Sequence, residues 1–82
     1  MDSFTAIADP TRRQMIELLR RGALPSTRVA EELKLKPQTA SMHLKTLERA
    51  GVVMVSRAGT KRIYSFNADA LEPATRWLLA LA

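Results

Sequence analysis

The sequence of 82 residues contains no cysteine and a single histidine, His43. A chain without cysteine forms neither disulfides nor thiolate metal sites, and one histidine cannot complete a tetrahedral metal site within one chain. The sequence also lacks a pair of carboxylates placed for acid–base catalysis and a glycine-rich loop that would hold a phosphate. These absences argue against an enzyme, and we expect no cofactor and no metal.

Long hydrophobic runs are also missing. No apolar run approaches the roughly 18 residues that a membrane-spanning helix requires. The opening residues "MDSFTAIADP" lack the basic and apolar pattern of a secretion signal, so we expect a cytoplasmic protein. The length predicts one domain over residues 1–82, with a core small enough that burial against a partner would add to its stability.

The net charge of +5 is concentrated in the middle third of the chain. Residues 36–62 contain six lysines and arginines against the single acid Glu48, whereas the flanking segments carry +1 and −1. A basic patch of this kind attracts polyanions, most commonly nucleic acid. A solvated basic surface without a partner would have the same composition.

Helical periodicity and its start and stop signals predict two helices in the first 35 residues. The segment "ADPTRRQMIELLRRG" has Asp9 as a predicted N-cap, Pro10 at the first helical position and Gly22 at its end, after a short helical lead-in "SFTAIA". The second helix, "STRVAEELK", has Ser26 as its predicted cap. The predicted buried face of this second helix consists of Val29, Ala30 and Leu33.

The third predicted helix, over residues 37–50, follows a turn of only a few residues. It begins with Pro37, and Gly51 ends it. The helical spacing predicts an inward-facing stripe formed by Ala40, Leu44 and Leu47.

After Gly51 the hydrophobic period changes from 3.6 to 2. The runs "VVMVSR" and "KRIYSF", separated by "AGT", predict a β-hairpin. The last segment, "ADALEPATRWLLALA", predicts a helix capped by Asn67 or Asp69, with Pro73 either in its first turn or bending it. The apolar residues that would share one face of this helix are Leu71, Ala74, Trp77, Leu78 and Leu81.

This order of elements predicts a mainly α fold with a β-hairpin, in the order α-α-α-β-β-α. It is the winged helix-turn-helix arrangement, with residues 26–50 as the helix-turn-helix and 52–67 as the wing. In such domains the second helix of the pair lies in the DNA major groove. Here that helix is 37–50.

The side chains left facing outward at the start of this helix suit DNA bases. Glutamine pairs with adenine, serine and threonine hydrogen-bond several base edges, and threonine or methionine contacts the thymine methyl group. The predicted base-reading residues are Gln38, Thr39, Ser41 and Met42. Each of them is also an ordinary solvent-facing residue when taken alone. Their grouping on the same turns, beside the excess of positive charge, favours the DNA interpretation.

Several other residues are predicted to contact the DNA backbone or the minor groove. Lys36 and Lys45 suit phosphates, and Arg57, Lys61 and Arg62 surround the hairpin tip "RAGTKR". The alternative for the tip is a charged edge that only protects the hairpin. We expect a structural or phosphate-contacting role for His43.

Three stretches carry a family resemblance. The segments "AIADPTRRQMIELLRRG", "VAEELKLKPQTASMHLKTLERAGVV" and "AGTKRIYSFN" resemble the ArsR family of bacterial winged-helix transcriptional regulators, over nearly the whole chain. The most specific parts are "DPTRR" and "HLKTLERAGVV". The resemblance implies a homodimer formed by the first and last helices, and binding of double-stranded DNA at an inverted-repeat operator, usually as a repressor.

In such a dimer the two ends of the chain, 1–22 and 68–82, would form the dimerisation helices. The alternative is that their apolar side chains fold back onto the core of the same chain. The residues predicted for the dimer interface are Phe4, Ile7, Trp77, Leu78 and Leu81.

The sequence also departs from the family pattern. Where metal-sensing members carry a Cys-x-Cys box, the corresponding positions look like Pro25 and Thr27, and the last helix offers only Asp69 and Glu72 for a second family metal site. The resemblance is therefore to the metal-free branch, which includes small autorepressors. Lys36 stands where relatives often have a capping serine, and losing that cap would cost about 1 kcal/mol.

Two interpretations therefore remain open from the sequence. The favoured one is a dimeric, sequence-specific DNA-binding repressor without a metal effector. The alternative is a winged-helix module that binds other proteins and has only nonspecific affinity for DNA.

Overall fold

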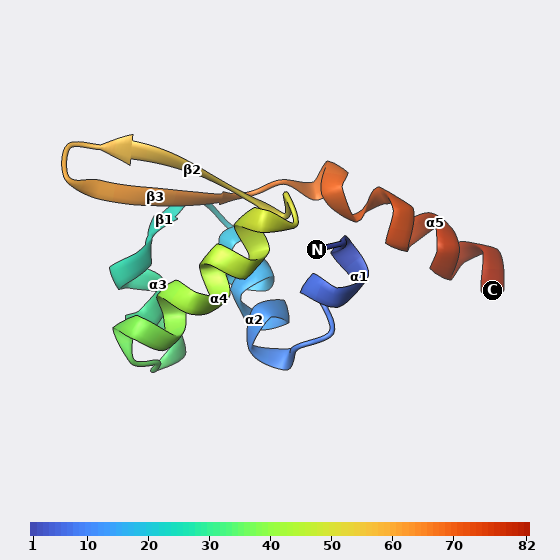
Figure 1. Ribbon diagram of the computed structural model, residues 1–82, viewed down its shortest axis with the longest axis horizontal. Helices are drawn as coiled ribbons and strands as arrows, with labels where there is room; N and C mark the ends of the chain where they lie inside the picture. Colours follow the sequence, from blue (N-terminus) through green and yellow to red (C-terminus); the bar gives the residue numbers. More distant parts are fainter.

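The computed structural model describes residues 1–82 as a winged helix-turn-helix domain with a three-stranded sheet, and it confirms the predicted fold class (Figure 1). The elements follow one another as α1 Ser3–Ala6, α2 Pro10–Leu19, β1 Leu24–Pro25, α3 Ser26–Leu33, α4 Pro37–Arg49, β2 Val53–Ala58, β3 Lys61–Phe66, the 3₁₀ turn η1 Ala68–Leu71, and α5 Glu72–Leu81.

Aspartates start the first two helices. The Asp2 carboxylate accepts a hydrogen bond from the Thr5 N–H at 2.8 Å, and the Asp9 carboxylate accepts one from the Arg12 N–H at 3.0 Å. The predicted cap at Asp9 is therefore confirmed, as is Pro10 at the first helical position, where its missing N–H costs nothing. Helix α2 ends at Leu19, earlier than the predicted stop at Gly22.

The start of α3 differs from the prediction. The expected cap at Ser26 is wrong, because Ser26 is already helical and the N-cap is Pro25, which makes no side-chain capping bond. Leu24 and Pro25 instead pair with β3 as a short edge strand that the sequence analysis missed, with Leu24 opposite Tyr64. A proline fits there because an edge strand leaves one row of N–H groups unused.

The sheet joins the wing to the helical body. Its strand order is β1-β3-β2 and all pairs are antiparallel. Strands β2 and β3 are aligned so that Val55 faces Tyr64 and Arg57 faces Arg62. The turn between them is Gly59–Thr60, and Gly59 has a φ of 65°, a left-handed conformation that glycine adopts without strain.

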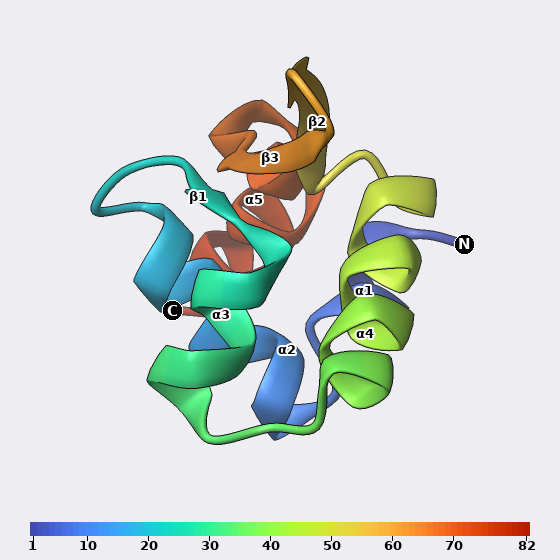
Figure 2. The same ribbon diagram turned by 90° about the vertical axis from the view of Figure 1, so that its left-hand side faces the viewer.

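The hydrophobic core lies where the helices meet the sheet. Ala40, Leu44 and Leu47 of α4 are completely buried, as the helical spacing predicted. Figure 2 shows α4 packed beside α2 and α3 with the sheet above them, so one long side of α4 is left free. The other core residues are Ala6, Met15, Ile16, Leu19, Val29, Ala30, Val52, Val53 and Tyr64.

The connection into α5 also differs from the prediction. Neither Asn67 nor Asp69 caps the helix through its side chain, because the short turn η1 precedes α5. The Asn67 side-chain N–H donates instead to the Gly51 carbonyl at 2.9 Å, and its backbone N–H donates to Val52 at 2.8 Å. Asn67 thus ties the end of β3 to the end of α4. Pro73 lies in the first turn of α5, as one of the two predicted arrangements required.

Helix α5 projects away from the body, at the end of the molecule opposite the hairpin (Figure 1). The overall dimensions are 42 × 23 × 22 Å. Ala74 is buried, but Trp77, Leu78 and Leu81 are 55%, 56% and 66% exposed. These three side chains do not fold back onto the core of their own chain, whereas Ile7 does pack against it.

Candidate nucleic-acid interface

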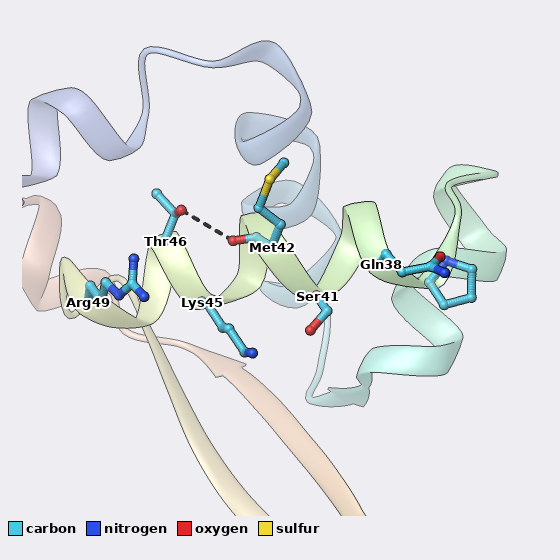
Figure 3. Close-up of a pocket in the computed structure, with 7 residues that line it drawn as sticks. Gln38, Ser41, Met42, Lys45, Thr46 and Arg49 are labelled. Carbon is cyan, nitrogen blue, oxygen red and sulfur yellow. Dashed lines mark hydrogen bonds between the residues drawn. The ribbon is translucent and has the colours of Figure 1, made fainter.

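The free face of α4 forms a shallow groove of mainly polar side chains (Figure 3). It lies opposite the buried stripe of Ala40, Leu44 and Leu47, because residues three and four apart share one side of a helix. The groove is lined by Pro37, Gln38, Ser41, Met42, Lys45, Thr46 and Arg49.

The structure brings together most of the predicted base-reading residues. Gln38, Ser41 and Met42 all line the groove, and Lys45 joins them. Figure 3 shows Ser41 and Lys45 pointing to one side of the helix and Met42 to the other. Thr39 does not line the groove and is only half-exposed.

Besides Pro37, two groove residues were missing from the predicted site. Thr46 follows Met42, and Arg49 follows Lys45, each at a spacing of four residues on the same face. The Thr46 hydroxyl donates to the Met42 carbonyl at 3.2 Å. Extending the helical spacing by one more turn would have found both residues from the sequence.

The first turn of α4 has free backbone donors. Its N-cap is Lys36, which makes no side-chain capping bond, and Pro37 has no N–H to donate. The next N–H groups of the first turn therefore have no intrahelical partner, and they suit an anion such as a phosphate. Lys36 is exposed beside them.

The basic residues of the wing continue this surface. Arg57, Lys61 and Arg62 are exposed on the hairpin, with Arg57 directly opposite Arg62. A second shallow depression lies between α4 and β3, where Arg62 lies near Lys45 and Arg49. Arg62 thus brings positive charge of the wing beside that of α4, with Glu48 as the acidic member of that depression, whereas Lys61 lines another depression with Pro25 and Thr27.

His43 lies on the flank of α4, outside the groove, and it is half-buried. Its Nδ1 atom is 3.4 Å from Nη1 of Arg12. The same guanidinium donates from Nε to the Ala6 carbonyl at 2.7 Å and from Nη2 to the Thr5 carbonyl at 3.0 Å. His43 therefore contacts the side chain that holds the end of α1.

The charges around His43 and Arg12 act on a nearby carboxylate. The pKa of Asp9 is lowered, chiefly because the backbone N–H of Arg12 donates to its carboxylate. The charges of His43 and Arg12 lower this pKa further, while desolvation opposes the shift.

The positions relevant to the family metal sites hold no ligand cluster. No group of three or more His, Cys, Asp or Glu side chains is arranged to hold a metal ion. Asp69 and Glu72 lie together at the start of α5, but Glu72 forms an ion pair with Arg76. Pro25 and Thr27 lie at the edge strand and the start of α3. None of the helices has the length and apolar character needed to cross a membrane.

The ends of the chain form an exposed apolar surface. The rings of Phe4 and Trp77 meet edge to face, with centroids 5.8 Å apart, and this contact joins α1 to α5. Phe4 is 42% exposed, whereas Ile7 is half-buried and packs against the core. Leu79, which was not predicted for this surface, is also exposed.

Known proteins share this sequence pattern and this fold. Residues 7–56 match the helix-turn-helix domain family. The transcriptional repressor SdpR of Bacillus subtilis is 36% identical over 76 residues, which cover 93% of this chain and 84% of SdpR.

Solved structures agree over more of the chain. The crystal structure of a possible transcriptional regulator for arsenical resistance superposes with a TM-score of 0.89 at 26% identity, covering 99% of this chain and 84% of the other. A homodimeric winged helix-turn-helix DNA-binding domain from Mycobacterium bovis, described as a possible ArsR-family regulator, gives 0.80 at 28% identity, covering 94% and 73%.

The groove on α4, the basic wing and these similarities agree on one class of protein, which consists of DNA-binding regulators and not of enzymes. The chain belongs to the ArsR family of winged helix-turn-helix transcriptional regulators.

Proposed function

We propose that the protein is a homodimeric repressor that binds an inverted-repeat operator without a metal effector. Helix α4 enters the major groove, and the wing reaches the adjacent backbone or minor groove. The observation that carries this proposal is the two-sided character of α4. Its apolar side is completely buried at Ala40, Leu44 and Leu47, while a polar groove faces outward beside the basic wing.

The side chains of α4 divide into two roles. Gln38, Ser41 and Met42 read base edges, and Thr39 contributes from the flank of the same turn. The residues assigned to the DNA backbone or minor groove are Lys36, His43, Lys45, Arg57, Lys61 and Arg62, and we now add Arg49.

Dimerisation is proposed through α1 and α5. Phe4, Trp77, Leu78 and Leu81 form an exposed apolar surface that a monomer would leave in water. The homodimeric relative from M. bovis supports this assembly. A twofold dimer presents two copies of α4 related by symmetry, so the matching operator is an inverted repeat.

The regions of the chain follow from this arrangement. We assign 1–22 and 68–82 to dimerisation, 26–50 to the helix-turn-helix and 52–67 to the wing. The similarity to the repressor SdpR supports repression, which a dimer achieves by covering a promoter and blocking polymerase. Such a protein would act in the cytoplasm, where bacterial DNA lies.

The absence of a metal effector is proposed on the chemistry of the side chains. The chain has no cysteine, and its carboxylates and single histidine form no cluster of three. A metal titration of the purified dimer tests this point. We expect Zn²⁺ at a stoichiometric level to leave operator affinity unchanged, and a large change would overturn the proposal of a metal-free regulator.

The main test is selection of random duplex DNA by the purified protein near physiological salt, where nonspecific binding is weak. We expect an inverted repeat with half-sites about one helical turn apart. Recovery of no motif would overturn sequence-specific regulation and favour a winged-helix module that binds proteins.

A further inference from the structure

We propose that Arg12 couples the dimer surface to the DNA-reading helix, so that dimerisation and operator binding strengthen each other through the protein itself. This inference rests on the proposed function, because it needs both a dimer and a DNA site. It assigns Arg12 a positioning role, since its side chain contacts α1 and α4 and none of the groove residues.

The guanidinium of Arg12 connects two elements that are distant in sequence. Its Nε and Nη2 donate to the carbonyls of Ala6 and Thr5, at 2.7 and 3.0 Å, at the end of α1. Its Nη1 lies 3.4 Å from Nδ1 of His43, near the middle of α4. The planar fork of an arginine can donate to two carbonyls and contact a third group in another direction at the same time.

Helix α1 is held in place by this contact together with the burial of Ala6 in the core. It is only four residues long, and so short a helix is not stable by itself. Arg12 donates to two carbonyls at the end of α1, and the Thr5 carbonyl also accepts from the Ala8 N–H at 3.2 Å. Any shift of α1 therefore moves the acceptors that orient the guanidinium.

The other side of α1 leads to the dimer surface. Phe4 packs edge to face on Trp77, and both side chains are about half-exposed. A second copy of the chain placed on this surface would bury Phe4 and fix α1. The continuous path of contacts runs from Trp77 through Phe4 and α1 to Arg12, and from there to His43.

The path ends at the base-reading residues. His43 directly follows Met42 in α4, and Ser41 and Lys45 lie within the same turn. The backbone of Arg12 is fixed at the start of α2, because its N–H donates to the Asp9 carboxylate at 3.0 Å. The orientation of α4 is thus linked to the placement of α1, which dimerisation sets.

The test measures this coupling without allowing the DNA itself to bridge two protomers. The dissociation constant of the dimer is measured by sedimentation, with and without a saturating short duplex that carries one selected half-site. Each protomer then binds its own duplex, and comparison of the wild type with the variants isolates the part of any change in dimer affinity that passes through Arg12. We expect the half-site duplex to tighten the wild-type dimer by about fivefold or more.

Two variants separate coupling from general damage. In Arg12→Lys we expect the ratio of the two dissociation constants to fall close to one, because an ammonium keeps the charge but cannot span both carbonyls of α1 and the His43 ring. Arg13→Lys is the matched control. Arg13 donates to the carbonyls of Ile7 and Ala8, at 2.8 and 3.1 Å, so it supports the same segment without a bond to α4. It should keep the wild-type ratio.

A further variant covers the case in which Arg12→Lys fails to fold. His43→Phe keeps a ring but removes the nitrogen that contacts Arg12, and it should also lower the ratio toward one. A wild-type ratio of one overturns the inference, as does a wild-type ratio retained in Arg12→Lys or in a folded His43→Phe. If the wild-type protein binds the half-site no better than a random duplex, the proposed function fails, and this inference fails with it.

Discussion

Gln38 and Lys45 lie in the same groove of α4 but are expected to act on DNA in different ways. Replacing Gln38 with Ala removes a side chain that pairs with a base edge. We expect a loss of about 1–3 kcal/mol on the selected operator and relaxed discrimination at one base pair. Binding measured on the operator and on its single-base variants provides the test.

Lys45→Ala is the matched change for a phosphate contact. It should weaken binding to all sequences about equally and reduce the slope of log affinity against log salt by about one. If Gln38→Ala instead weakened all sequences equally, its assignment to base reading would be contradicted.

The charge of the Asp9 carboxylate should make the stability of the fold depend on pH. Its pKa is lowered from 3.8 because the Arg12 N–H donates to the carboxylate, with help from the nearby charges of Arg12 and His43. A lowered folded-state pKa stabilises the protein above the unfolded value, and the stabilisation is lost as the pH falls through the folded pKa.

We therefore expect Asp9→Ala to lower the melting temperature by a few degrees at pH 7. This difference from the wild type should shrink as the pH falls below 3.8 and the Asp9 carboxylate becomes protonated. Asp69→Ala is the control, since Asp69 caps no helix. Thermal melts across this pH range measure the effect, and a pH-independent difference would argue against a role for the charged cap.

At the level of elements, α4 combines a poor helix start with a favourable position for a phosphate. Lys36 is its N-cap and makes no capping bond. Lys36→Ser should supply that bond and raise the free energy of unfolding by about 0.5–1 kcal/mol. The same change should weaken operator binding, because it removes a positive charge beside the first turn.

Denaturant unfolding and operator titration of the Lys36→Ser variant provide the two measurements. Lys34→Ser is the comparison: it removes a lysine from the same loop at the left-handed C-cap of α3, where a serine starts no helix. A Lys36→Ser protein that gains stability but keeps its full affinity would show that Lys36 does not contact DNA.

Most elements could be predicted because their signals are local. The aspartate and proline before α2, the apolar stripe of α4 and the change of period after Gly51 are all read from neighbouring residues. The strand β1 could not be predicted in this way. It consists of two residues, one of them a proline, and becomes a strand only by pairing with β3.

The same limit explains the wrong caps. Ser26 has the right residue type for a cap. Pro25 pairs with β3 and takes the N-cap position, so α3 begins at Ser26, one residue earlier than predicted. Asn67 is likewise used for a tertiary bond to Gly51 instead of a local cap. In the groove, Thr39 was placed by closeness in sequence, whereas the helical turn directs it to the flank.

At the level of the whole molecule, the exposed end of α5 predicts an assembly that can be broken without unfolding the protomer. Trp77 is 55% exposed, so Trp77→Glu should leave the domain folded and prevent dimerisation. We expect a monomer by sedimentation and a loss of about a hundredfold or more in affinity for the full operator, because both half-sites are no longer held together.

Affinity for an isolated half-site should fall much less in this variant. Thr75→Glu, at a nearby exposed residue, is the control because it adds the same single negative charge to α5. A Trp77→Glu protein that remains dimeric would place the dimer surface elsewhere.

The register of the hairpin places two arginines opposite each other in the wing. Arg57 faces Arg62 across the two strands, and like charges in directly opposed positions repel each other. A phosphate placed between them would be attracted to both side chains and would also remove this repulsion. The free hairpin therefore carries a mildly unfavourable charge pair, and if the wing contacts DNA as proposed, part of its contribution to DNA affinity would come from removal of this repulsion.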